Sequence, residues 1–233
     1  MKRIILFLTL LFASFGSTFA SEQTEKFDAG KLIMEHLGDS YYWHIFTYND
    51  LDVSIPLPII LINEGKIDIF MSSKFHHGHS TYKGYKIATG ADGEGLEGSI
   101  ICVDSNGVYT GKKPLDFSIT KNVFAIFIVT SLIVFLVLKG AKIAKKREGQ
   151  APKGLLTVVE YFISFIKDDI ALPSIGEHKY KKYLPYLLTA FLFIFFSNLL
   201  GLFPFFPGGA NITGNIAVTL CLAVFTFVIT NVS

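Results

Sequence analysis

The last fifty residues of the chain, 184–233, contain no charged side chain. A cationic segment, residues 178–182, comes immediately before them. This stretch divides into two apolar runs, residues 184–203 and 212–233, which are joined by the short uncharged segment 204–211. Each run is about 20 residues long, which is the length that an α-helix needs to cross the hydrocarbon core of a bilayer. The pattern therefore predicts a tight helical hairpin in a membrane, with lysines fixing it to one face.

The remaining charge is divided by region. Residues 21–116 carry 14 acidic side chains and 8 lysines, a net charge of −6, whereas residues 139–182 carry 10 basic and 5 acidic side chains, a net charge of +5. The apolar run 122–138 separates the two regions. Since Lys and Arg beside membrane spans stay on the cytoplasmic side, we expect the acidic region outside and the basic region inside. The run itself is predicted to be a first span, extended outward to residue 117.

The first twenty residues have the pattern of a secretory signal peptide. Lys2 and Arg3 form a basic start, residues 4–12 an apolar core, and residues 18–20 a cleavage site of small residues. The alternative is an uncleaved anchor, but the apolar core is short for a membrane span. A signal peptide places the following residues outside the cytoplasm, as the charge pattern also does.

Residues 21–116 are predicted to form a small β-rich exported domain. After a helix over residues 24–38, strands are expected at residues 43–48, 53–62, 67–71, 82–88 and 99–103. Pro56 and Pro58 favour an edge strand within the second of these, and residues 63–66 form a hairpin turn. Cys102 is expected to be a buried strand residue. It lies in a different environment from Cys221, so we do not expect a disulfide between them.

The exported domain also contains three histidines within four residues, His76, His77 and His79. Imidazoles at this spacing can hold a transition metal. A solvated loop is the plainer interpretation, because the segment is polar and interrupted by glycine. The chain shows no nucleophile elbow, phosphate loop or zinc-protease helix, so we expect no cofactor. The negative charge of the domain argues against nucleic-acid binding.

Between the first span and the hairpin, residues 152–173 have helical periodicity. Pro152 suits the first turn of a helix and Pro173 its end. One face is apolar, with Leu155, Val159, Phe162, Ile166 and Ile170. The other face is polar, with Lys153, Thr157, Glu160, Ser164 and Lys167. Such a helix lies along a membrane interface, although the core helix of a soluble domain has the same pattern. The predicted fold is therefore mixed: a β-rich exported domain, then an α-helical multi-pass membrane domain with an interfacial amphipathic helix.

The hairpin contains polar residues that a simple anchor does not need. Ser197 and Asn198 precede its turn, and Thr213 and Asn215 follow it. In an antiparallel hairpin the two pairs lie at similar depth, in the outer half of the bilayer. They can serve as hydrogen-bonding contacts between helices. They can equally line a polar half-pathway across the membrane.

The sequences around these residues form a specific pair of motifs. Residues 197–204 read Ser-Asn-Leu-Leu-Gly-Leu-Phe-Pro and residues 213–220 read Thr-Gly-Asn-Ile-Ala-Val-Thr-Leu, after Tyr-Leu-Pro-Tyr-Leu-Leu at residues 183–188. Together with Pro-Lys-Gly at residues 152–154, they resemble subunit a of the F-type ATP synthase, the membrane stator beside the rotating c-ring. The resemblance covers residues 122–233. The long N-terminal region is similar to extended forms of this subunit in the Bacteroidetes group.

The resemblance implies a function in proton transport. Protons would enter from outside through a half-channel, neutralise a carboxylate of the c-ring, and leave through a second half-channel to the cytoplasm. The candidate residues of the outer half-channel are Asn198 and Asn215, followed by Ser197, Thr213 and Thr219. The implied partners are the c-ring, stator subunit b, other ATP synthase subunits and the lipid bilayer. The implied location is the inner membrane, with a periplasmic N-terminal domain. No active site of its own is expected, because nucleotide chemistry belongs to the catalytic head.

The chain departs from this family at one point. The family's essential arginine lies on a later helix, and no arginine follows Arg147 here. The sequence is therefore expected to be a fragment or a natural truncation. The alternative function is a membrane-anchored exported binding or sensor domain, in which the His-rich loop carries the activity.

Overall fold

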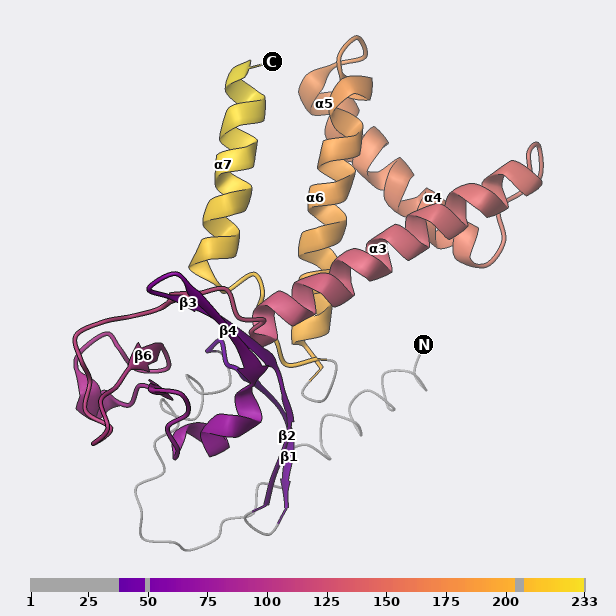
Figure 1. Ribbon diagram of the computed structural model, residues 1–233. Helices are drawn as coiled ribbons and strands as arrows, with labels where there is room; N and C mark the ends of the chain where they lie inside the picture. Colours follow the sequence, from indigo (N-terminus) through magenta and orange to yellow (C-terminus); the bar gives the residue numbers. More distant parts are fainter. Residues whose placement is uncertain (1–37, 49–50, 204–207, 233) are drawn as a thin grey trace, which may run out of the picture. The chain divides into compact units, whose positions relative to one another are not determined.

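The computed structural model describes residues 38–48, 51–203 and 208–232. A β-rich part is followed along the chain by helices, in the order that the sequence predicts (Figure 1). The predicted signal peptide, residues 1–20, lies outside the described residues. The predicted helix over residues 24–38 also lies outside them, except for its last residue.

The described residues of the β-rich part form seven strands in three small antiparallel sheets. The strands are β1 (Tyr42–Tyr48) with β2 (Leu51–Pro56), β3 (Pro58–Asn63) between β4 (Lys66–Met71) and β7 (Leu115–Asp116), and β5 (Tyr85–Ile87) with β6 (Ile100–Cys102). Each predicted strand is present, although the last two are shorter than expected. The hairpin turn is confirmed: Asn63 pairs with Lys66, and both Glu64 and Gly65 have the positive φ of a two-residue primed turn.

The prediction of one edge strand over residues 53–62 is wrong. The buried Leu57 separates two strands, and the second of them, β3, is the central strand of its sheet. Pro58 is tolerated there because it is the first residue of the strand, where a missing N–H breaks no ladder bond. Its carbonyl oxygen still accepts a hydrogen bond, from the backbone N–H of Ile119 at 2.9 Å.

One face of the three-stranded sheet forms the core of the β-rich part. Ile59 and Leu61 of β3 are fully buried there, together with Phe75 from a short 3-10 segment, Ser72–Gly78. Cys102 lies in the same cluster as a free thiol, as the sequence predicts.

Helix α3 (Lys121–Lys146) begins directly after the β-rich part. Its N-terminal Thr120 accepts a hydrogen bond from the Val123 N–H, and Thr120 in turn donates to the carboxylate of Asp39 at 2.7 Å. The helix differs in both ends from the predicted span of 117–138, which stays a prediction. The helix starts later, because Phe117 still belongs to the sheet ladder, and it continues into the basic region that begins at residue 139. Lysine and alanine are good helix formers, and cations are favourable at a helix C-terminus.

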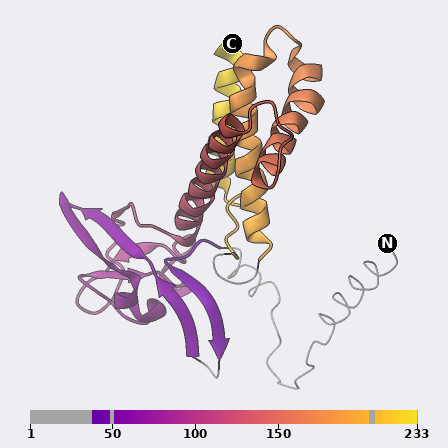
Figure 2. The ribbon, with the colours of Figure 1, turned by 90° about the vertical axis from the view of Figure 1, so that its right-hand side faces the viewer.

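The predicted amphipathic helix is three connected segments: α4 (Leu155–Ser164), a π-helical segment η3 (Phe165–Ala171) and α5 (Leu172–Ile175). Pro152 lies before the helix rather than in its first turn. Pro173 lies in the first turn of α5, so it does not end the helix. Instead the chain leaves the helix at Gly176, whose φ of 86° suits glycine. Helix α4 packs against α3 and α6, as Figure 2 shows.

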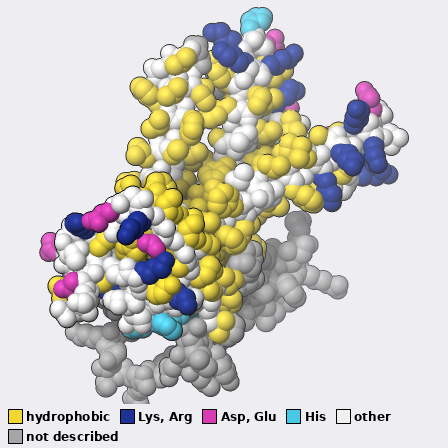
Figure 3. Space-filling view, viewed as in Figure 1, with side chains coloured by type: hydrophobic (Ala, Val, Ile, Leu, Met, Phe, Trp, Pro, Cys, Tyr) yellow, Lys and Arg dark blue, Asp and Glu magenta, His cyan; other side chains and the backbone are white. Residues whose placement is uncertain are grey.

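The predicted hairpin consists of α6 (Tyr180–Gly201) and α7 (Ile216–Val232). Helix α7 starts later than expected, and no residue of α7 is buried. A hydrogen bond of 2.7 Å joins Tyr186 and Thr226 across the two helices. Among the described helices, α3 and α6 are long and apolar enough to cross a membrane, whereas α7 is apolar but has 17 residues. Hydrophobic side chains cover these helices, and basic side chains gather at the far end of α3 (Figure 3).

The packing of α4 on α3 depends on a glycine. Gly140 is buried, and a Cβ added there would lie 3.1 Å from both methyl carbons of Val159. We expect Gly140→Leu to lower the free energy of unfolding by about 1–3 kcal/mol, because the larger side chain forces the helices apart. Thermal unfolding of the detergent-solubilised protein measures this effect. The matched control is Ser131→Leu at an exposed position of the same helix, and equal unfolding midpoints for the two variants would contradict the prediction.

Candidate functional site

A polar pocket lies where α6 ends and the chain turns toward α7. Its volume is about 160 Å³. Its lining consists of Ser197, Asn198, Gly201, Gly209, Ala210, Asn211 and Thr213. This volume is several times the ~30 Å³ that one water molecule occupies in the liquid, so the pocket has room for several waters. Three of the five predicted pathway residues, Ser197, Asn198 and Thr213, therefore lie together.

The pocket forms because the end of α6 and the following loop approach each other closely. Gly201 has no side chain, and an added Cβ would lie only 3.3 Å from the carbonyl oxygen of Ala210. On the opposite side, the Thr213 hydroxyl donates to the Asn198 Oδ1 at 2.6 Å. This bond brings one residue from each of the two polar groups of the hairpin into contact.

Ser197 is the buried polar group of the pocket. Its side chain is 1% exposed, and within the part of the chain that the structure describes its Oγ has no hydrogen-bond partner. A buried hydroxyl without a partner costs about 1–3 kcal/mol. Because Ser197 lies on the wall of a pocket large enough for water, a bound water is the partner that this hydroxyl can use.

The structure does not bring Asn215 and Thr219 into the pocket lining. The side-chain oxygen of Asn215 accepts a hydrogen bond from the Ala217 N–H at 2.9 Å. Its backbone oxygen accepts from Val218 and Thr219. Asn215 therefore caps the start of α7, and this role explains why the helix begins at Ile216.

No sequence pattern indicated the role of Trp43, a residue of β1 that contacts the loop between α6 and α7. Its indole Nε1–H donates to the carbonyl oxygen of Gly208 at 3.1 Å, and its ring meets that of Phe124 edge to face. Trp43 is 2% exposed, in a cluster with two residues of α3 and with Ala210 and Ile212 of the loop. The only available signal was that Trp43 is the single tryptophan of the chain.

Gly208 fits this position because no larger residue can. A Cβ added to it would lie 2.2 Å from the carbonyl oxygen of Phe203 and 2.8 Å from that of Leu200. Both neighbours are backbone atoms, so they cannot rotate away. The loop backbone is thus packed directly on the end of α6.

The three predicted metal-binding histidines are not arranged as ligands. His76 and His77 both have positive φ, at 44° and 58°, and the ring of His77 stacks on Tyr42 with centroids 4.4 Å apart. Among residues 38–48, 51–203 and 208–232, no three His, Cys, Asp or Glu side chains are grouped so that they could hold a metal ion. The geometry therefore gives no support to a metal site at His76, His77 and His79.

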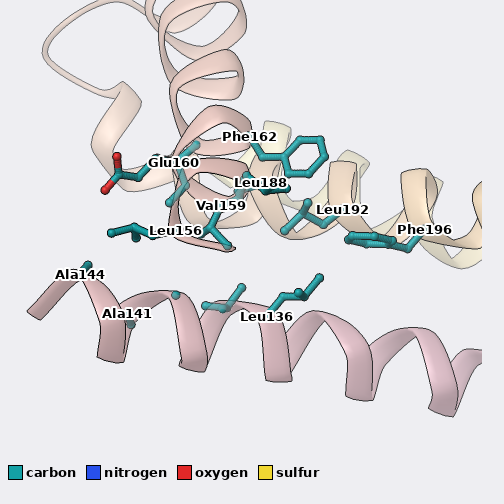
Figure 4. Close-up of a pocket in the computed structure, with 14 residues that line it drawn as sticks. Leu136, Ala141, Ala144, Leu156, Val159, Glu160, Phe162, Leu188, Leu192 and Phe196 are labelled. Carbon is teal, nitrogen blue, oxygen red and sulfur yellow. The ribbon is translucent and has the colours of Figure 1, made fainter. Parts of the chain in front are cut away.

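A second cavity, here called the apolar groove, lies between α3, α4 and α6 and has a volume of about 310 Å³. Figure 4 shows its walls, with Leu136 from α3, Val159 from α4 and Leu192 from α6. Glu160 is its one charged residue, and its carboxylate points away from Leu192 (Figure 4). A cavity with such walls offers no route for protons.

Comparison with known proteins divides the chain into the same two parts. A family model described as ATP synthase A chain matches residues 123–233. A second, described as domain of unknown function (DUF8433), matches residues 32–117. The chain matches no solved structure.

Curated relatives match mainly the helical part. The chain is 52% identical to ATP synthase subunit a 2 of Chlorobaculum tepidum over 119 residues, which is 51% of this chain and 33% of that protein. It is 43% identical to ATP synthase subunit a of Chlorobium phaeobacteroides strain BS1 over 162 residues, which is 63% of this chain and 46% of that protein. The chain thus spans between a third and just under half the length of these relatives.

Trp43→Phe tests the hydrogen bond from Trp43 to the loop together with the packing of the part of the indole ring that phenylalanine lacks. We expect Trp43→Phe to lower the free energy of unfolding by about 1–3 kcal/mol, because the buried Gly208 carbonyl loses its donor. Thermal unfolding of the purified protein measures the loss. Tyr109→Phe is the control, since it removes a polar group, the hydroxyl, from an aromatic ring in a different hydrophobic cluster. An unchanged midpoint for Trp43→Phe would show that the bond contributes nothing.

Proposed function

We propose that the chain is part of the proton-translocating stator subunit of the F-type ATP synthase, because residues 123–233 match the family model described as ATP synthase A chain. In this role it provides the half-channels that load and unload the c-ring carboxylate while a proton gradient drives ATP synthesis. Its partners are the c-ring, stator subunit b and other subunits of the complex. The observation that carries the proposal is the polar pocket, whose lining includes Ser197, Asn198 and Thr213 from the two motifs that resemble the family.

The proposed topology follows from the charges. The far end of α3 carries Lys145 and Lys146, and Arg147 follows it, so this end lies in the cytoplasm. The β-rich part then lies on the opposite, periplasmic side of the inner membrane, and α3, α6 and α7 cross the bilayer. The end of α6 that lines the polar pocket faces the periplasm. Helix α4 lies near the cytoplasmic face.

The polar pocket is proposed to be a segment of the outer half-channel. An excess proton is strongly disfavoured in hydrocarbon, so it must travel along water and polar groups. The hydroxyls of Ser197 and Thr213 and the amide of Asn198 can each hold water by hydrogen bonds, although none of them titrates near neutral pH. Their role is to keep a water-filled path in place. They do not take up the proton themselves.

The proton gradient sets the direction of proton movement, and the electrostatics of the c-ring site couple that movement to rotation. A carboxylate is costly against lipid when it is ionised and far less so when it is protonated. Delivery of a proton from the periplasmic side therefore allows the carboxylate to rotate into the lipid. The family's arginine, on a later helix, keeps the facing carboxylate ionised and blocks a direct leak between the half-channels.

Asn198→Leu tests the pocket directly. The change removes the amide that accepts from Thr213 and fills the pocket with an apolar side chain. We expect a several-fold loss of proton-driven ATP synthesis, with normal assembly of the complex, when the full-length subunit carries the change. ATP synthesis by inner-membrane vesicles under an imposed proton gradient measures the rate.

The matched control is Asn231→Leu in α7. The Asn231 amide bonds only locally in the structure, to the Phe227 carbonyl one turn earlier at 2.8 Å. If Asn198→Leu leaves the synthesis rate per assembled complex unchanged but reduces the amount of complex, Asn198 is a packing contact and the pocket is not part of the pathway.

A further inference from the structure

The three-stranded sheet β4–β3–β7 has two apolar faces, although only one of them forms the core. Ile59 and Leu61 of β3 point into the core, so Ile60 and Ile62 point to the opposite side. The strand register places Ile69 beside Ile60 and Ile67 beside Ile62. We call this second side the outer face.

The outer face is exposed. Beside β3 it consists of Ile67 (65% exposed), Ile69 (67%) and Met71 (42%) on β4, Leu115 (64%) on β7, and Phe117 (62%) directly after β7. Antiparallel sheets with one buried face normally alternate apolar and polar residues, so that the other face suits water. A contiguous exposed apolar surface, by contrast, marks a site of interaction with a protein or a membrane.

The charged residues of these strands lie elsewhere. Asp68 alternates with Ile67 and Ile69 and therefore points to the opposite side, where it accepts from Lys83 at 2.6 Å. Glu64 lies in the hairpin turn and pairs with Lys112 at 2.7 Å. The outer face thus carries neither of these charges. The ion pairs of Asp68 and Glu64 lie on the opposite side of the sheet and at its hairpin turn.

Backbone hydrogen bonds join the sheet to the segment directly before α3. Phe117 donates its N–H to the Ile60 carbonyl, and Ile119 donates to the Pro58 carbonyl, each at 2.9 Å. This ladder continues almost to Lys121, where the helix begins. Four residues, 117–120, span at most about 14 Å even when fully extended. The outer face therefore cannot lie far from the end of a helix that enters the bilayer.

Figure 3 shows the same relation on the surface. Hydrophobic side chains are gathered over the part of the β-rich region that lies next to the helices, and charged side chains occupy the part farther away. The apolar surface of the sheet thus continues toward the apolar surface of the helices.

We propose that the outer face of the β4–β3–β7 sheet docks on the lipid bilayer. Its isoleucines, Met71 and Phe117 lie at the boundary between headgroups and acyl chains of the leaflet in which α3 starts. Apolar side chains at this depth contact acyl chains in place of water, and the ion-paired residues Asp68 and Glu64 remain outside the hydrocarbon. The proposal rests on the crossing of the membrane by α3, but it does not depend on the polar pocket or on proton transport.

Spin labels report which medium covers the outer face. The full-length subunit, assembled in its complex, is reconstituted in vesicles of phosphatidylethanolamine and phosphatidylglycerol. A nitroxide is attached at Ile69→Cys after the native cysteines are replaced by alanine, and Ile67→Cys provides a second position on the same face. At each position, the electron-spin relaxation of the nitroxide is measured with two agents. One is oxygen, which concentrates in lipid, and the other is a nickel chelate, which stays in water.

Two control positions calibrate the measurement. A nitroxide at Asn106→Cys lies in an exposed turn of the β-rich part, so it gives the relaxation expected in water. Val134 is half exposed near the middle of α3, so a nitroxide at Val134→Cys gives the relaxation expected in lipid. We expect the labels at Ile69 and Ile67 to be relaxed more by oxygen than by nickel, as at Val134 and opposite to Asn106.

Each other result overturns the proposal and identifies the reason. Strong nickel relaxation at Ile69, as at Asn106, means that the face is in water. Protection from both agents means that protein covers it. A water signature at Val134 itself means that α3 does not cross the bilayer, so that the proposed topology fails together with the docking surface.

Discussion

The buried cluster around Trp43 joins three parts of the chain that are far apart in sequence. It brings the strand β1 against the first half of α3, through Ala125 and Val129, and against the loop before α7, through Ala210 and Ile212. The indole N–H satisfies a loop carbonyl that is 165 positions away along the chain. Because the same loop lines the polar pocket, the pocket wall depends on a contact made by the β-rich part. A helical domain without that part would have to hold this loop in another way.

The hydroxyl groups of the helices show why the pocket differs from an ordinary membrane contact. In hydrocarbon each polar group needs a partner within the protein. Thr189, Thr226 and Thr230 find theirs in the backbone of their own helix, each four residues earlier. By contrast, Thr213 bonds across to Asn198, and Ser197 faces the pocket with its hydroxyl unpaired within the described residues. Tyr186 and Thr226 also bond across the two helices, but the pocket combines such a bond with a buried hydroxyl that has no partner among the described residues.

The sequence predicted the types and order of the elements, the hairpin turn at Glu64 and Gly65, and the proximity of Asn198 to Thr213, because these follow from local patterns. Helix ends were less predictable. The lysines after residue 138 were predicted to end the membrane span, yet they continue α3 because lysine favours helix. Asn215 was predicted to lie within the second helix of the hairpin, but it is the N-terminal cap of α7. The contact of Trp43 with Gly208 has no local signature at all, so only the folded chain reveals that part of the site.

The apolar outer face of the β4–β3–β7 sheet also bears on how the protein is made. Strands β3 and β4 precede α3 in the chain, so they are synthesised before the helix that anchors them. During that interval their apolar face meets water, and exposed strands of this kind associate readily with one another. On the proposed docking of this face, newly made chains are most vulnerable to aggregation before α3 enters the bilayer. The timing of membrane insertion would then protect the β-rich part from self-association, as the final contacts do.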